Sequence, residues 1–86
     1  MASLRVEYDS AAERELRRIA PRDISRIVAA VSKLAEDPFP RQSLKLAGEN
    51  DLFRLRVGDY RVIYELDAGA GVVTVYRIRH RRDAYR

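Results

Sequence analysis

Residues 53–66 carry two short runs of alternating side chains joined by a tight turn, and this pattern limits the fold more than any other feature of the chain. Apolar residues and arginines alternate over residues 53–57, so one face of a strand can be buried while the other stays in solvent. The following Val-Gly-Asp-Tyr step turns the chain into a second run, residues 61–66. Another turn, rich in glycine and alanine, precedes residues 72–78, which are mostly β-branched or aromatic. We therefore expect a meander of three antiparallel strands.

The chain before this meander predicts one strand and two helices. Residues 4–8 alternate apolar and polar side chains, as a half-buried strand does. Ser10 and Glu13 have the spacing of a capping box, whose side chains bind the free amides at a helix start, so the first helix should begin near Ala11. Pro21 ends this helix, and because proline is tolerated in the first turn, it can also start the next one.

The second predicted helix has the stronger apolar face, and the Asp-Pro-Phe-Pro segment at residues 37–40 ends it. Residues 41–51 form a polar connection that Leu44 and Leu46 are expected to anchor. These elements predict a single α+β domain of residues 1–86: an N-terminal strand, a helical hairpin, and an antiparallel three-strand meander. The helices should pack on one face of this small twisted sheet and leave the other face for function.

The charge of the chain favours a polyanion as partner. Its net charge is +4 and its pI is near 9.8. Of the 17 basic residues 15 are arginine, whose planar fork suits bidentate phosphate contacts, although GC-rich coding would give the same bias. The excess of positive charge lies in residues 51–86, where eight arginines face five acidic residues.

Other classes of function are disfavoured by what the sequence lacks. It has no cysteine for a disulfide or a thiolate metal site, no glycine-rich phosphate loop, and no His/Asp/Glu spacing typical of metal ligands. We therefore expect an activity without metal or cofactor. The N-terminus has no apolar run suited to a signal peptide or membrane span, which predicts a cytoplasmic protein without membrane contact.

Two segments taken together resemble the RelE/ParE toxin superfamily. The first, residues 52–64, is an arginine-bearing strand followed by a Gly-Asp-Tyr-Arg turn and a strand ending in tyrosine. The second, residues 78–85, contains the pattern His-Arg-x-x-x-Tyr. RelE-like members typically carry these features in this order, and the helical hairpin also falls where the superfamily has it. The resemblance therefore extends over essentially the whole chain.

This resemblance implies the toxin of a type II toxin–antitoxin system, an endoribonuclease that cuts mRNA on the ribosome. A cognate antitoxin would neutralise it, and operator DNA would be bound only through the complex with that antitoxin. By the same resemblance, Arg54 matches a catalytic basic position, Arg61 and Arg81 match arginines that handle the phosphate and transfer protons, and Tyr85 matches a terminal tyrosine that positions the substrate. The sequence departs from the pattern at Leu52, where RelE-type enzymes can carry a lysine. His80 is a plausible replacement as general base.

The chemistry of RNA cleavage leads to the same residues. Without a metal, the 2′-hydroxyl must be deprotonated, the phosphorane stabilised and the leaving 5′-oxygen protonated. Alternation could place Arg54 and Arg56 on one strand face, and cross-strand pairing could bring Arg61 beside them. His80 is the only histidine, and imidazole is the side-chain group best suited to take and give a proton under physiological conditions, although a lone histidine is often structural and alternation would point it away from Arg81. The predicted substrate-binding residues are Arg56, Arg79 and Arg82.

Two other functions fit the same residues. A ParE-like toxin of this fold would inhibit DNA gyrase by protein contact and have no nuclease activity. A basic domain could also bind RNA or DNA without cleaving it. Arg61 of the hairpin, together with His80, Arg81 and Tyr85, favours the nuclease, because a gyrase inhibitor has no need for these groups to converge.

Overall fold

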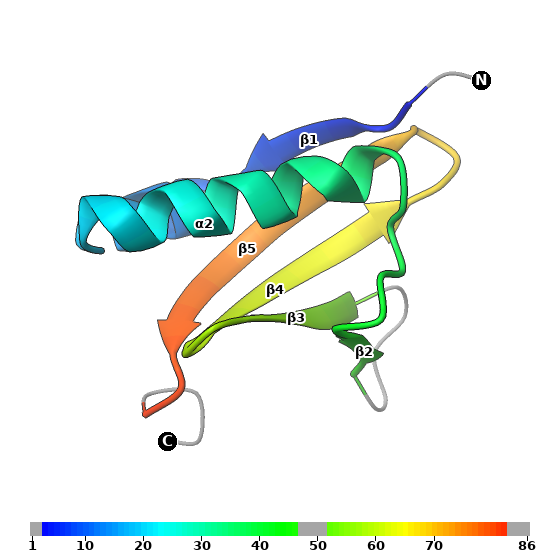
Figure 1. Cartoon of the computed structure of the whole chain (residues 1–86). Helices are drawn as coiled ribbons and strands as arrows, with labels where there is room; N and C mark the ends of the chain where they lie inside the picture. The colour runs from blue at the N-terminus through cyan, green and yellow to red at the C-terminus, as the bar shows by residue number, and fades with distance from the viewer. Residues whose placement is uncertain (1–2, 47–51, 83–86) are drawn as a thin grey trace.

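A computed structural model describes residues 3–46 and 52–82 of the chain (Figure 1). Strand β1 (Arg5–Tyr8) is followed by helices α1 (Ser10–Arg17) and α2 (Pro21–Ser32) and by a short 3-10 helix, η1 (Lys33–Ala35). Four strands complete the fold: β2 (Ser43–Lys45), β3 (Leu52–Val57), β4 (Tyr60–Asp67) and β5 (Val72–His80). Over these two ranges, no helix combines the length and the hydrophobicity needed to cross a membrane.

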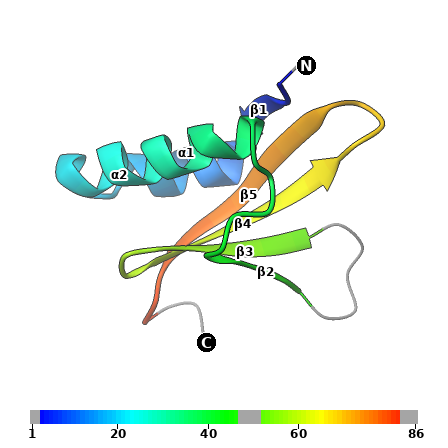
Figure 2. The same ribbon diagram turned by 45° about the vertical axis from the view of Figure 1, so that its right-hand side comes forward.

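The strands form one sheet in the order β1-β5-β4-β3-β2. β1 lies parallel to β5, and all other neighbouring strands are antiparallel. Both helices lie on the same side of the sheet, as Figures 1 and 2 show from two directions. The predicted α+β fold, with a strand, a helical hairpin and a meander under helices on one face, is therefore confirmed. We call the sheet surface that faces away from the helices the open face.

The predicted polar connection contains a strand that the sequence pattern did not indicate. Strand β2 pairs with β3 and forms one edge of the sheet. Backbone bonds hold this segment: the Leu46 N–H donates to the Leu52 carbonyl at 3.0 Å, and the Arg56 N–H donates to the Gln42 carbonyl at 3.2 Å. Leu44 is 58% exposed, so the prediction that it anchors the connection is wrong.

The start of α1 also differs from the prediction. Asp9, not Ser10, is the N-cap: its backbone is extended, and its Oδ2 accepts a hydrogen bond from the Ala11 N–H at 3.2 Å. Ser10 is the first residue of the helix, so the capping box does not form as expected. A carboxylate suits this position because it also faces the positive end of the helix dipole. Pro21 begins α2, as predicted.

The core lies between the helices and the sheet. It consists of aliphatic residues and one tyrosine that are almost completely buried: Ala12, Ile27, Val31, Leu34, Leu55, Val62, Tyr64, Val73, Val75 and Ile78. The hydroxyl of Tyr64 donates to the Pro38 carbonyl at 2.7 Å, which ties the chain after η1 to the middle of the sheet. Among the residues that the structure describes, no charged residue is buried, so every arginine lies at the surface.

A β-bulge in β5 decides which of its residues face the helices. The register between β4 and β5 shifts between Ile63 and Tyr64, which leaves Tyr76 as an extra residue in β5. The residues of β5 that belong to the core cluster therefore change from odd numbers, Val73 and Val75, to an even number, Ile78. Without this bulge Arg79 would point into the core. With it, Arg79 lies outside the core at the end of the sheet.

Candidate functional site

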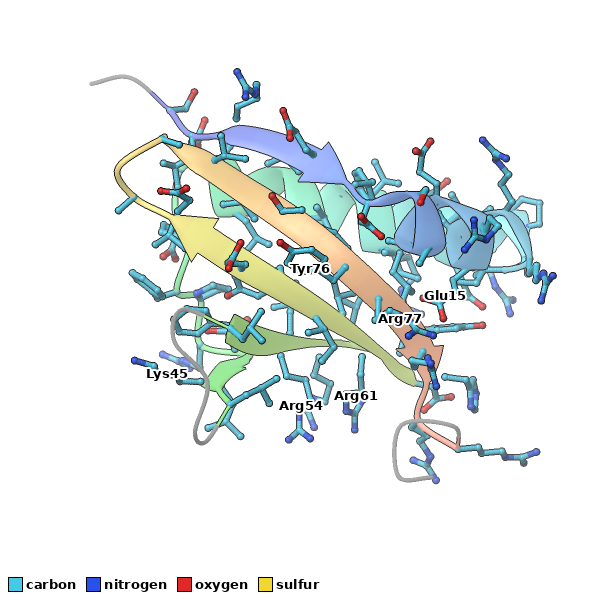
Figure 3. The ribbon with its side chains drawn as sticks, turned by 180° about the vertical axis from the view of Figure 1, so that it is seen from behind. Glu15, Lys45, Arg54, Arg61, Tyr76 and Arg77 are labelled. Atoms are coloured by element: carbon cyan, nitrogen blue, oxygen red, sulfur yellow. The ribbon has the colours of Figure 1, made fainter. Side chains whose placement is uncertain are left out.

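Three arginines lie side by side across the meander. Arg56 of β3 is directly opposite Arg61 of β4, and Arg61 is directly opposite Arg79 of β5. We call these three residues the arginine row. Arg54 lies two residues before Arg56 and therefore on the same strand face. Figure 3 shows Arg54 and Arg61 pointing in the same direction from neighbouring strands, away from the helices.

Most of the charge in this region has no acidic partner. Within residues 3–46 and 52–82, no ion pair involves Arg54, Arg56 or Arg61. The one side-chain hydrogen bond among these three joins Arg61 Nη1 to the Tyr60 carbonyl at 3.2 Å, again within the described ranges. Like charges opposite one another in a sheet are unfavourable unless an anion offsets them. The hairpin therefore presents guanidinium groups that a phosphate could bind bidentately.

Arg79 differs from the other two members of the row because it is already engaged. Its Nε donates to Glu15 of α1 at 3.1 Å, and its side chain is 38% exposed. The same carboxylate accepts from Arg77 Nη2 at 2.9 Å and from the Ile78 N–H at 2.7 Å. Partial burial opposes ionisation of Glu15, but the hydrogen bonds from Arg77 and Ile78 outweigh it and hold the pKa of Glu15 below its ordinary value.

His80 lies on the opposite side of the sheet from Arg54 and Arg61. It pairs across the strands with Tyr60, one residue away from Arg61, so its ring faces the helices. The rings of His80 and Tyr60 meet edge to face at 5.3 Å. Together with Arg22 and Arg26 of α2 they line a polar pocket of about 190 Å³. The structure therefore does not bring His80 onto the open face with Arg54, Arg56 and Arg61.

The remaining predicted site residues follow β5. Arg81 donates its backbone N–H to the Asp59 carbonyl, at 2.6 Å, and its Nη1 lies 3.8 Å from Asp59 Oδ1. Both side chains of this pair are about two-thirds exposed, so the guanidinium of Arg81 remains accessible. Arg82 is exposed, and its N–H donates to His80 Nδ1 at 3.2 Å, which leaves Nε2 to carry the proton of a neutral imidazole. Tyr85 lies outside the described residues.

The sequence analysis did not select Glu15, because the residue pattern placed it among several charged side chains on the solvent-exposed face of the first helix. Its spacing gave no signal, since its partners Arg77, Ile78 and Arg79 lie more than 60 positions away. Tyr76 also was not selected: its hydroxyl donates to Glu65 at 3.0 Å on the open face. In the described ranges, no group of three or more His, Cys, Asp or Glu residues is arranged to hold a metal ion.

Comparison with known proteins assigns a family to this arrangement. Residues 6–85 match the family model described as the ParE toxin of a type II toxin–antitoxin system, parDE. The chain is also 34% identical over 89 residues to Toxin RelG of Mycobacterium tuberculosis, a match that covers 94% of each protein.

Solved structures show the same fold. The RelE–RelB complex from Pyrococcus horikoshii has a chain that superimposes with a TM-score of 0.83 at 28% identity, covering 94% of this chain and 98% of that one. The toxin–antitoxin complex RelBE2 from M. tuberculosis gives a TM-score of 0.81 at 28% identity, with coverage of 91% and 98%. The similarity therefore extends through both helices and the sheet.

Proposed function

Because this chain belongs to the RelE/ParE superfamily and is the toxin of a type II toxin–antitoxin system, we propose that it cleaves mRNA on the ribosome without a metal ion. In this reaction the 2′-oxygen attacks the adjacent phosphorus, and the bond from phosphorus to the 5′-oxygen breaks. The products are a 2′,3′-cyclic phosphate and a free 5′-hydroxyl. The enzyme must remove one proton, donate one, and offset the charge of the phosphorane.

The observation that carries this proposal is the cluster of cations on the hairpin. Arg56 and Arg61 face one another across β3 and β4, with Arg54 on the same side, and none of the three has an acidic partner among the described residues. Such an arrangement disfavours folding and favours binding of a phosphate that carries negative charge on several oxygens. We assign Arg54 and Arg61 to stabilisation of the phosphorane, and Arg56 to binding of the RNA backbone.

In this proposal, residues at the end of β5 and directly after it transfer the protons. Arg81 is held beside the hairpin turn through Asp59, and His80 precedes it. We propose Arg81 as a proton-transfer group and Tyr85 as the residue that positions the substrate. His80 is the second candidate for proton transfer, although its ring lies on the helix side of the sheet, and a pH–rate profile tests its role. Arg79 and Arg82 would contact the RNA backbone on either side. A pH–rate profile with an apparent pKa that disappears in His80→Ala would assign one step to the imidazole, whereas an unchanged profile would assign both steps elsewhere.

The partners follow from the same proposal. Two of the similar structures are complexes of a toxin with RelB, and on this basis we propose that a cognate antitoxin neutralises this chain. Substrate and site of action would be mRNA and the ribosome in the cytoplasm, and operator DNA would be contacted only through the antitoxin complex. We further propose that residues 1–86 act as a single domain.

The alternative is inhibition of DNA gyrase without nuclease activity. It is favoured by one specific finding, namely that the matching family model is described as a ParE toxin. A gyrase inhibitor would act through protein contact, and its activity would not depend on the arginines of the open face.

Primer extension on mRNA from cells that express the chain briefly tests both functions. The wild type should give cuts within translated codons, and Arg61→Ala and Arg81→Ala should abolish them. Arg5→Ala is the matched control, because Arg5 lies in β1 at the opposite edge of the sheet from β2 and pairs with Glu7. Growth arrest with intact mRNA in the wild type would contradict the nuclease, and loss of DNA supercoiling by purified gyrase would then support the alternative.

A further inference from the structure

The edge of β5 loses its neighbouring strand halfway along its length. β1 pairs with β5 from Val72 to Val75, and the last backbone bond between the two segments joins the Asp9 N–H to the Val75 carbonyl at 2.8 Å. Beyond this point the chain of β1 turns away into α1. The second half of β5, which leads to His80 and Arg81, therefore lacks a strand on this edge within the described residues.

The carboxylate of Glu15 takes the place of that strand. Its Oε1 accepts the Ile78 N–H at 2.7 Å, the kind of bond that a neighbouring strand would supply. Its Oε2 accepts from Arg77 Nη2 at 2.9 Å and from Arg79 Nε at 3.1 Å. Figure 3 shows Glu15 and Arg77 side by side at this edge. The Glu15 side chain is only 22% exposed, so water competes weakly for these bonds.

Helix α1 is itself fixed at this place. Its N-cap, Asp9, is the residue whose N–H binds β5, and Ala12 is completely buried between the helix and the sheet. Glu15 lies one turn after Ala12, so its carboxylate approaches the edge of β5 from a rigid support. On the other side of β5, the Arg81 N–H donates to the Asp59 carbonyl of the hairpin turn. The end of β5 is thus held from both sides.

We propose that Glu15 is a positioning residue for RNA cleavage, which fixes the end of β5 so that Arg79 and Arg81 stand in register with the arginines of the hairpin. This inference rests on the proposed nuclease function. Glu15 does not touch the substrate in this proposal. It acts through the Ile78 amide and through Arg79, which lies directly across from Arg61.

Two variants separate the parts of this role. Glu15→Ala removes every bond to β5, whereas Glu15→Gln keeps an amide oxygen that can accept the Ile78 N–H but loses the charge that attracts the arginines. The matched control is Glu13→Ala, which removes an exposed carboxylate of the same helix that lies 3.8 Å from Arg17. All proteins are purified at full length, and the folded fraction of each is determined by thermal unfolding before activity is measured.

The first measurement is hydrogen exchange at the amides of Ile78 and Arg81, which needs no activity. Glu15→Ala should accelerate exchange at both amides, whereas Glu13→Ala should leave both as in the wild type. The second measurement is cleavage of ribosome-bound mRNA. Because misplacement of a catalytic group by about 1 Å can cost roughly 100-fold in rate, we expect kcat of Glu15→Ala to fall about 10- to 100-fold with KM within about twofold. Glu15→Gln should lie between.

The outcomes distinguish this inference from the proposed function. If the wild type does not cleave RNA, the proposed function fails and the role of Glu15 in positioning the site for cleavage fails with it, whereas faster exchange at Ile78 in Glu15→Ala would still show that Glu15 holds the strand. If the wild type cleaves and Glu15→Ala, corrected for its folded fraction, cleaves as fast as Glu13→Ala, the inference is overturned. Unchanged exchange at Ile78 would overturn it as well.

Discussion

Replacing Arg61 by glutamine should stabilise the fold while abolishing the proposed activity. Arg61 is the middle member of the arginine row, with Arg56 opposite on one side and Arg79 opposite on the other. Among residues 3–46 and 52–82, no acidic side chain forms an ion pair with the guanidinium of Arg61. Glutamine removes the charge and keeps part of the aliphatic stem. The difference in stability between Arg61→Gln and the wild type therefore reports mainly on electrostatic repulsion and little on packing.

The size of the effect follows from the two neighbours. Cross-strand pairs contribute about 0.2–1 kcal/mol, and like charges directly opposite are unfavourable by a similar amount. The full repulsion applies to the pair of Arg61 with Arg56. The repulsion between Arg61 and Arg79 is weaker, because Glu15 offsets the charge of Arg79. The bond from Arg61 to the Tyr60 carbonyl is long at 3.2 Å, and water can replace it. We expect a gain of about 0.5 kcal/mol, which raises the Tm by about 2–4 °C in a domain of this size.

Thermal unfolding at low and high salt measures this gain. The Debye length falls from about 10 Å at 0.1 M to about 3 Å at 1 M, so the difference in Tm between Arg61→Gln and wild type should shrink as salt is added. Arg54→Gln is the control, because Arg54 faces the uncharged Ile63 and Leu44 and has no like charge directly opposite. A destabilised Arg61→Gln, or a gain that is independent of salt, would refute this explanation.

Three further predictions concern the contacts that hold the fold. Tyr64→Phe should lower the free energy of unfolding by about 1–2 kcal/mol in urea, because the Pro38 carbonyl loses its donor, and an unchanged midpoint would contradict this. Asp9→Ala should lower the free energy of unfolding by about 1 kcal/mol, and Ser10→Ala should lower it by clearly less. A larger effect of Ser10→Ala would indicate that Ser10, not Asp9, caps the helix. The pKa of Glu15 is lowered in the folded state, so the stability it contributes is present above its unfolded pKa and is lost as pH falls through the folded pKa. Calorimetry across the acid range should therefore show a shallower loss of stability in Glu15→Gln, and parallel curves would count against this assignment.

Local patterns predicted most of the fold. The hairpin followed from alternation on both sides of Gly58, which adopts a positive φ of 58° at the turn, and the second helix followed from Pro21 and its apolar face. Strand β2 could not be predicted, because three residues are too few for a period and their pairing with β3 depends on chain that is distant in sequence. The N-cap was missed by one position, because aspartate and serine are almost equally good caps and only the backbone geometry distinguishes them.

The site was predictable where it depended on one hairpin and not where it depended on packing. Alternation and the short turn were enough to place Arg56 opposite Arg61. The bulge at Tyr76 appears as a step of three between the buried residues Val75 and Ile78, where a regular strand has a step of two. Recognising this step requires knowing which residues are buried, so the alternation of the sequence alone did not predict it. This step sets the face of every later residue in β5. The contact of Glu15 with β5 joins a helix to a strand more than 60 residues away and leaves no local signal.

The distribution of charge in this fold separates residues that serve only function from those that serve folding as well. Arg56 and Arg61 lie outside the core and opposite one another, so removal of either leaves no buried partner unsatisfied and relieves repulsion. Glu15 closes the edge of β5, so its removal should lower stability and activity together. Relief of repulsion should make Arg61→Gln more stable whichever function holds, and a nuclease that uses the open face also requires this variant to be less toxic. A gyrase inhibitor that acts through another surface requires the same variant to keep its toxicity, and measuring stability and toxicity in one set of variants decides between the two.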